Sequence, residues 1–146
     1  MADPGSRTPH SVFWLVLRVL LGGLLFYAGF SKLASAWQFA RAIANFRLLP
    51  PILNQIAAVV LPWYEAVAGL MLVLGLWTRA SSLLSTCLFA AFGIAVSAAL
   101  ARGLDIECGC FGTGSGAHVG ALTLILDLMG LAASIAIAIR REPAVH

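Results

Sequence analysis

Apolar residues dominate this chain in four long runs, and shorter stretches between them contain most of the polar residues. The runs cover about residues 12–30, 56–77, 81–101 and 119–139. Crossing the hydrocarbon core of a bilayer takes about 20 apolar residues in a helix, which is close to the length of each run. Because a lipid-exposed backbone must satisfy its own hydrogen bonds, we expect every run to be α-helical. The pattern predicts an all-α membrane protein: a four-transmembrane-helix bundle with both termini on one side.

The stretch between the first two runs, about residues 34–48, has a different periodicity. Its large apolar residues recur at helical spacing on one face, and its polar residues fall on another. The apolar face comprises Trp37, Phe39, Ala40, Ile43 and Phe46. Two prolines follow, and proline cannot continue a helix. We expect a short amphipathic helix in the membrane interface, acting either as an anchor or as a lid over the bundle.

The composition fits a membrane protein and excludes a nucleic-acid-binding one. Of the 146 residues, 61% are hydrophobic and 10% charged, whereas about a quarter of a soluble domain is charged. The net charge of +3 is small, and the basic residues form no dense patch. Arg140 and Arg141 follow the last run, which favours a cytoplasmic C-terminus. We expect a multi-pass protein of the inner (plasma) membrane in contact with lipid, with the 102–118 loop facing the periplasm or exterior.

Two cysteines separated by one glycine lie in the 102–118 loop. Cys108 and Cys110 can close a small, strained disulfide that is readily reduced, which suits electron exchange more than fold stabilisation. Two alternatives remain, an inert pair of thiols and a half-site for a soft metal that His118 would complete. Cys87 is expected to be a buried bystander.

Three ionisable residues fall inside the apolar runs, where charge is costly and therefore a functional candidate. They are Arg18, Glu65 and Asp127. With a rise of 1.5 Å per residue, all three lie about 12–18 Å below the membrane face that carries the 102–118 loop. Because their depths are similar, we predict that they form one shared cluster. The cluster is either a structural ion pair or a proton-relay or quinone-binding site, for which Trp63 and Tyr64 are candidate wall residues.

Several short segments, taken in order, resemble the MauE branch of the DoxX-like integral membrane proteins. They are Arg18 to Lys32, Leu61 to Glu65 with Gly69, Gly75 to Arg79, Cys108 to Gly112, and Asp127. The resemblance extends over about residues 12–139. It implies a four-helix membrane protein linked to redox chemistry. MauE proteins are associated with maturation of periplasmic methylamine dehydrogenase, whose small subunit is rich in disulfides, and DoxX relatives with quinone-linked sulfur oxidation.

The architecture is also similar to that of disulfide-generating quinone reductases of the vitamin K epoxide reductase type. Those enzymes use a Cys-x-x-Cys pair, whereas this chain has Cys-x-Cys and no second loop pair. We therefore expect a membrane thiol–disulfide oxidoreductase in which Cys108 and Cys110 exchange electrons directly with a thioredoxin-like or disulfide-containing protein on the exterior face. A quinone is the expected cofactor, bound without a covalent link. The alternatives are a soft-metal-binding membrane protein and a non-catalytic maturation helper.

Overall fold

The computed structural model describes residues 9–106 and 120–139. Within these ranges the regular structure is entirely helical, and four of the five helices are long and apolar enough to cross a membrane. The helices are α1 (Pro9–Ala34), α2 (Ala36–Asn45), α3 (Pro51–Leu74), α4 (Thr78–Ala101) and α5 (Ala121–Ile139). The predicted fold class, a four-span bundle with a short amphipathic helix after the first span, is confirmed.

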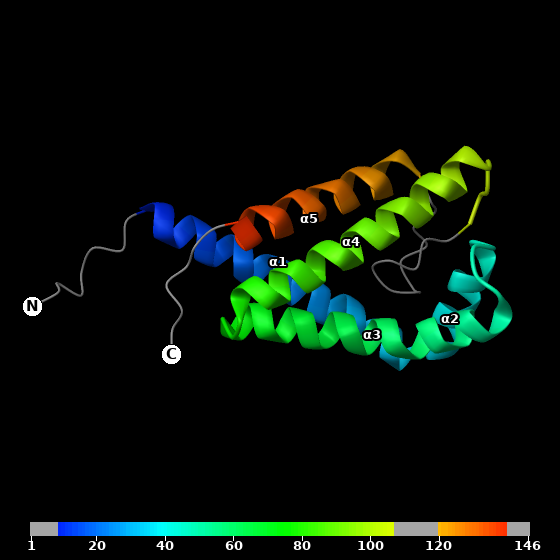
Figure 1. The fold of residues 1–146 in the computed structure, drawn as a ribbon, viewed down its shortest axis with the longest axis horizontal. Coiled ribbons are helices and arrows are strands. Elements are labelled where there is room, and N and C mark those ends of the chain that lie inside the picture. Colours follow the sequence, from blue (N-terminus) through cyan, green and yellow to red (C-terminus); the bar gives the residue numbers. More distant parts are fainter. Residues whose placement is uncertain (1–8, 107–119, 140–146) are drawn as a thin grey trace, which may run out of the picture.

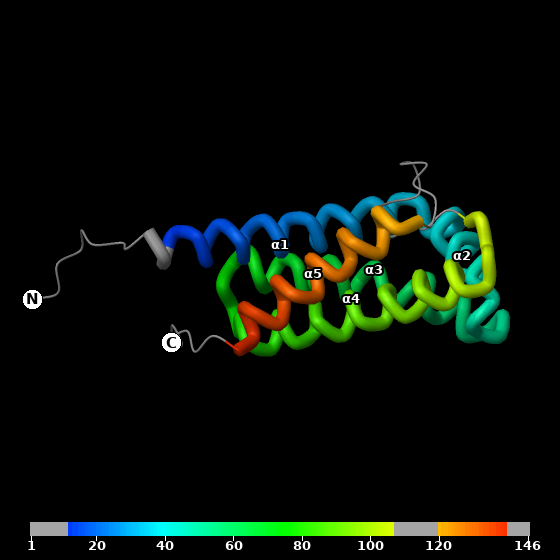
Figure 2. Tube along the Cα trace, turned by 90° about the horizontal axis from the view of Figure 1, so that it is seen from above, coloured from blue at the N-terminus to red at the C-terminus, as the bar shows by residue number. Residues whose placement is uncertain are grey.

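The four long helices form an elongated bundle, with α2 at one end (Figures 1 and 2). Helix α1 packs chiefly against α3, and α4 packs chiefly against α5. The start of α1 and the end of α5 lie at the same end of the bundle, opposite α2 and the last turns of α4. Helix α1 continues to Ala34, beyond the run that ends at residue 30, and this extension brings its last turn beside α2.

Glycines allow α1 and α3 to approach until their backbones touch. A Cβ atom on Gly69 would lie 2.4 Å from the backbone nitrogen of Phe26, and one on Gly29 would lie 2.6 Å from that of Ala66. Only a residue without a side chain fits at such distances. Small residues are the usual means by which helices pack closely in lipid, where no hydrophobic force drives them together. This contact fixes the rotation and the register of α1 against α3.

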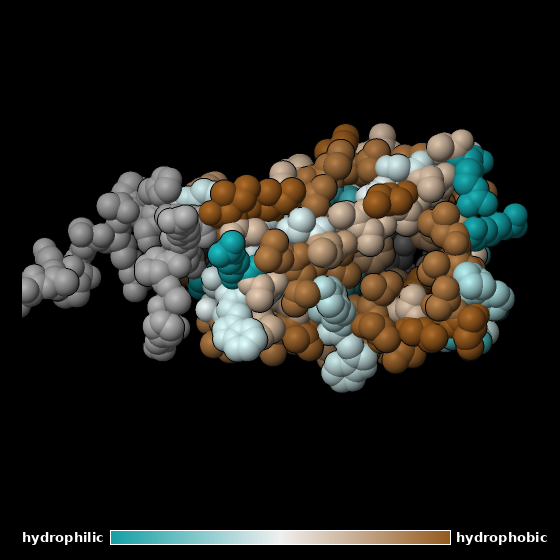
Figure 3. Space-filling model, viewed as in Figure 1, coloured by the Kyte–Doolittle hydropathy of each residue, from teal (hydrophilic) through white to brown (hydrophobic). Residues whose placement is uncertain are grey.

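The outer surface of the bundle is largely apolar, as expected for a protein whose helices face lipid (Figure 3). Large residues such as Leu20 and Leu122 are exposed on different helices. Cys87 also lies on this outer surface, on α4. The expectation that Cys87 is buried was therefore wrong, because contact with lipid keeps an apolar thiol from water as effectively as burial does.

Candidate functional site

A buried ion pair joins the end of α1 to the middle of α3. The Lys32 ammonium donates hydrogen bonds to both carboxylate oxygens of Glu65, each at 2.6 Å. Lys32 is 0% exposed and Glu65 is 2% exposed. Charges this far from water are stable only when each neutralises and hydrogen-bonds the other. In a membrane protein such a pair is a functional candidate by default.

Two aromatic rings enclose the Lys32 ammonium. The nitrogen lies 5.2 Å from the ring centroid of Phe39 on α2 and 4.9 Å from that of Phe92 on α4. Both distances are within the range of a cation–π contact, which strengthens when the cation is desolvated. With Glu65 from α3, side chains from four helices meet at this point. The amphipathic helix α2 thus closes the site rather than only anchoring the chain.

The register of α1 explains why Lys32 is buried. The buried residues Gly22, Leu25, Gly29 and Lys32 follow one another along α1 at intervals of three, four and three residues. Residues at such spacing share one helical face, which here is the face against α3. The sequence did not identify Lys32 as a site residue, because the predicted first span ended at residue 30. Lys32 was therefore assigned to the charged residues of the following loop. The continuous spacing of this face was the signal that could have found it.

Asp127 lies on the other side of Glu65, on α5. Together the two carboxyls line a small cavity of about 20 Å³, whose other walls are apolar. That volume holds about one water molecule. Asp127 Oδ2 is buried, and it accepts no hydrogen bond in the part of the chain that the structure describes. The structure therefore brings Glu65 and Asp127 to one cavity, as the predicted cluster required.

Arg18 does not join this cluster, and the prediction of one cluster shared by Arg18, Glu65 and Asp127 was wrong for Arg18. Its guanidinium lies at the C-terminal end of α3, with Nη2 3.0 Å from the position of a Cβ on Gly75. Gly75 follows Glu65 by ten residues, which is about 15 Å along a helix. The last carbonyls of a helix attract a cation. Arg18 thus occupies a site where its charge stabilises the end of α3.

Trp63 and Tyr64 face away from the ion pair. Both line a shallow groove on the outer surface of the bundle, together with Val60 and Leu84. Trp63 is 59% exposed. Aromatic residues on an outer surface of this kind are common in contact with lipid. The structure therefore does not place Trp63 or Tyr64 in the walls of a site that contains Glu65.

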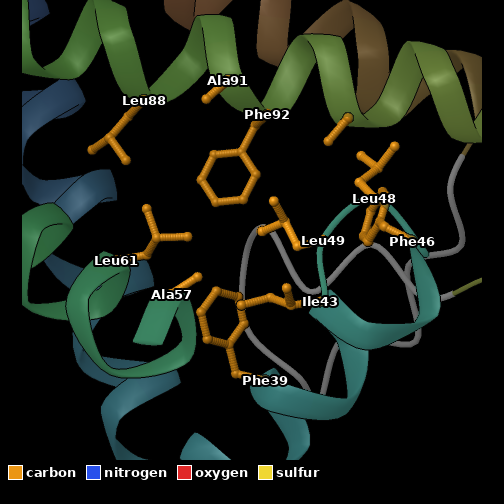
Figure 4. A pocket seen from close by; sticks show the side chains of 11 residues that line it. Phe39, Ile43, Phe46, Leu48, Leu49, Ala57, Leu61, Leu88, Ala91 and Phe92 are labelled. Carbon is orange, nitrogen blue, oxygen red and sulfur yellow. The ribbon is translucent and has the colours of Figure 1, made fainter. Parts of the chain in front are cut away.

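A second, larger cavity of about 280 Å³ lies between α2, α3 and α4. Figure 4 shows Phe39 and Ile43 of α2, Ala57 and Leu61 of α3, and Ala91 and Phe92 of α4 around it. Its lining is almost entirely apolar. The surface is hollowed in this region, beside α2 (Figure 3). We call this cavity the apolar pocket. Phe39 and Phe92 separate it from the Lys32 ammonium.

The described ends of the thiol loop are fixed beside the apolar pocket. Ile106 and Leu124 pack against a buried cluster of Phe46, Val96 and Ala99, and Phe46 also lines the pocket. Cys108, Cys110 and His118 lie outside the described residues. The loop therefore starts and ends at the α2 end of the bundle, the end at which the buried ion pair is closed.

Arg102 links the end of α4 to the end of α2. Its Nη1 donates hydrogen bonds to the carbonyls of Phe46, at 3.1 Å, and Arg47, at 3.5 Å. These bonds hold the end of α2 against the end of α4.

We expect the substitution Arg102→Gln to raise the rate of amide hydrogen exchange in the last turn of α2 about tenfold. The reason is the loss of a charge-assisted hydrogen bond of roughly 1.5 kcal/mol. Exchange in α3 should not change. Unaltered exchange at Phe46 would show that the contact does not hold α2.

No group of three or more histidine, cysteine, aspartate or glutamate side chains is placed to hold a metal ion within residues 9–106 and 120–139. The soft-metal alternative rests on Cys108, Cys110 and His118, which are outside those ranges.

Comparison with known proteins shows which family this sequence is similar to. Residues 10–140 match the family described as Methylamine utilisation protein MauE. A protein named Methylamine utilization protein MauE from Paracoccus denitrificans is 33% identical over 128 residues, 87% of this chain and 68% of that protein. Its namesake from Methylorubrum extorquens is 37% identical over 99 residues, 67% of this chain and 53% of that protein.

A third protein of that name, from Paracoccus versutus, is 32% identical over 104 residues, 70% of this chain. The matches span only 53% and 55% of the Methylorubrum extorquens and Paracoccus versutus proteins. No solved structure matches the chain.

Proposed function

The chain belongs to the MauE family of methylamine utilisation proteins, and from this premise we propose that it is a membrane thiol–disulfide oxidoreductase that serves the maturation of an exported protein. Cys108 and Cys110 are the exchanging pair. The observation that carries the proposal is their spacing, one glycine apart, because a disulfide closed at that spacing is strained and easily reduced.

The positions of the neighbouring described residues support this role. The thiol loop follows Ile106 and ends before Leu124, and both residues pack against the buried cluster of Phe46, Val96 and Ala99. A pair of cysteines within this loop is therefore tethered to the end of the bundle that carries α2. Thiol exchange with a soluble protein requires an accessible thiol, and the proposal places the pair in a loop between two membrane-spanning helices for that reason.

The proposed partner is a thioredoxin-like or disulfide-containing protein on the exterior side of the membrane. Disulfides persist in the periplasm and outside the cell. Arg140 and Arg141 at the end of the last span favour a cytoplasmic C-terminus, so the thiol loop faces the exterior. The sequence has three cysteines, namely this pair and Cys87 on α4, so it offers no second cysteine pair to pass electrons on. The partner therefore exchanges directly with the Cys108–Cys110 pair.

The reaction also needs a carrier of electrons. When two thiols become one disulfide, two S–H bonds break, one S–S bond forms, and two electrons and two protons leave. A quinone takes up both electrons and both protons and becomes a quinol, and it dissolves in the bilayer. We propose a membrane quinone as the acceptor for the Cys108–Cys110 pair. With a quinol as donor, the reverse reaction balances equally.

The test is thiol labelling of the purified protein with a maleimide before and after mild reduction. We expect Cys108 and Cys110 to be labelled only after reduction. Cys108→Ser and Cys110→Ser should each abolish thiol exchange with a reduced thioredoxin-fold protein. Cys87→Ser is the matched control, since it removes an exposed thiol on α4 and should leave exchange unchanged.

Two results would contradict the proposal. Copper or zinc bound in stoichiometric amount to the freshly purified protein, with loss of the metal in Cys108→Ser, would identify a metal site in place of a redox pair. Full maturation of the exported substrate in cells carrying the double variant Cys108→Ser and Cys110→Ser would leave the chain a helper without thiol chemistry.

A further inference from the structure

We infer that the apolar pocket between α2, α3 and α4 is a binding site for the ring of a membrane quinone, and that the Lys32 ammonium is the hydrogen-bond donor for one of its carbonyls. The inference rests on the proposed function, because it assigns the acceptor of that reaction to a place in the fold. The sequence pattern did not predict this pocket. None of the residues predicted to bind a quinone lines it, although one of them, Glu65, is hydrogen-bonded to Lys32.

The size and lining of the pocket suit a substituted ring. Its volume is about 280 Å³, whereas an apolar cavity of about 150 Å³ is enough for benzene. Two phenylalanine rings, Phe39 and Phe92, point into it from α2 and α4 (Figure 4). Flat aromatic walls favour a flat ligand, which can stack against them.

One polar group of the required kind, the Lys32 ammonium, lies behind the Phe39 and Phe92 rings of the pocket wall and does not itself line the pocket. An ammonium has three N–H donors, and the two hydrogen bonds of Lys32 both go to Glu65. No further oxygen acceptor for Lys32 is present among residues 9–106 and 120–139. The third N–H is therefore left beside Phe39 and Phe92, the two rings that separate it from the pocket. A turn of the Phe92 ring would open a path for a carbonyl oxygen.

A buried donor without an acceptor is costly, and a ligand carbonyl that meets it recovers that cost. The Glu65 carboxylate keeps the ammonium charged and fixes its position, so Glu65 is a positioning residue. As the quinone is reduced, negative charge develops on its oxygens, and a fixed cation stabilises that charge strongly in a site without water. The ion pair thus offers a neutral quinone a hydrogen bond and a reduced quinone a counter-charge.

The pocket is also close to the point where the described chain leads into the thiol loop. Phe46 lines the pocket and belongs to a buried cluster with Val96 and Ala99. Ile106, the last described residue before the thiol loop, and Leu124, beyond it, pack against this cluster. Electrons from a Cys108–Cys110 pair would enter the bundle at this end. A lipid acyl chain is the other apolar occupant, but it has no acceptor for the third N–H of Lys32.

Photolabelling of the full-length protein in lipid nanodiscs with an azido-quinone tests the site. We expect the label on peptides of α2, α3 and α4, and we expect excess decylubiquinone to remove it while excess oleic acid does not. Ala91→Phe fills the pocket and should lower labelling about tenfold, equivalent to about 1.4 kcal/mol of binding free energy. Ala132→Phe is the matched control, because Ala132 is exposed on α5.

The double variant Lys32→Met with Glu65→Leu separates binding from folding. Removing both charges together leaves no unpaired ion, so the protein should fold and yet lose labelling about tenfold. The inference is overturned if oleic acid competes as well as decylubiquinone, if Ala91→Phe labels like the wild type, or if the label lies on peptides of α1 and α5 alone.

The cysteine variants distinguish this inference from the proposed function. Labelling of the pocket should persist when Cys108 and Cys110 are both serine, since neither forms the pocket. Labelling with no thiol exchange in the wild type would refute the redox role and leave the quinone site standing. Thiol exchange without labelling would refute the quinone site and leave the redox role.

Discussion

Lys32→Met is expected to destabilise the bundle by about 3–5 kcal/mol, the usual cost of removing one partner of a buried ion pair. The reason is that Glu65, at 2% exposure, keeps its carboxylate while both of its hydrogen bonds are lost. The measurement is reversible unfolding in mixed micelles with increasing sodium dodecyl sulfate, followed by circular dichroism. Purified Lys32→Met should unfold at a much lower denaturant fraction than the wild type.

Two variants show whether the effect belongs to the ion pair. Adding Glu65→Leu to Lys32→Met should restore most of the lost stability, because an apolar pair of similar volume leaves no buried charge. Arg79→Met removes a cation from an exposed position at the start of α4 and should change stability by less than about 0.5 kcal/mol. If the double variant were as unstable as Lys32→Met alone, the ion pair would not be the cause.

Gly69→Ala is expected to separate α1 from α3 and to cost about 3 kcal/mol, at the upper end of the range for overpacking a core. The added Cβ would lie 2.4 Å from the nitrogen of Phe26 and 2.6 Å from the carbonyl oxygen of Gly22. Both obstacles are backbone atoms, so no side-chain rotation can relieve the clash. The same unfolding measurement applies, and cross-linking between cysteines introduced on facing positions of α1 and α3 should become slower.

Gly23→Ala is the matched control for this substitution. A Cβ on Gly23 would have no heavy atom within 4 Å, and alanine is a better helix former than glycine. The variant should therefore be at least as stable as the wild type. Equal losses of stability in Gly69→Ala and Gly23→Ala would show that helix propensity, rather than close packing, governs both positions.

The fold was predictable because membrane insertion imposes few solutions. Four apolar runs of about the required length can only be four helices in lipid, and the periodicity of Trp37 to Phe46 identified α2. The end of the first span was less predictable. The charge of Lys32 led us to end the predicted first span before it. In the structure Lys32 is buried, because Phe39 of α2 and Phe92 of α4 cover it. A neighbouring helix can extend the apolar environment past the end of a run.

The candidate site was predictable in its components but only partly in its arrangement. Charge inside an apolar run identified Glu65 and Asp127, and the structure brings them to one small cavity. The same reasoning predicted that Arg18 is the cation of a cluster with these two carboxyls. The structure instead places the Arg18 side chain at the C-terminal end of α3. The apolar pocket had no sequence signal, because its walls come from three helices whose residues are ordinary for a membrane protein.

The sequence by itself determined the number of spans, the amphipathic α2 and the spacing of Cys108 and Cys110. The tertiary structure decided which cation on α1 meets Glu65. Counting residues gives distance along one helix, since each adds about 1.5 Å. It gives neither the rotation of a helix nor its register against a neighbour. The backbone contact of Gly29 with α3 sets both for α1, and it places Lys32, one turn beyond, against Glu65.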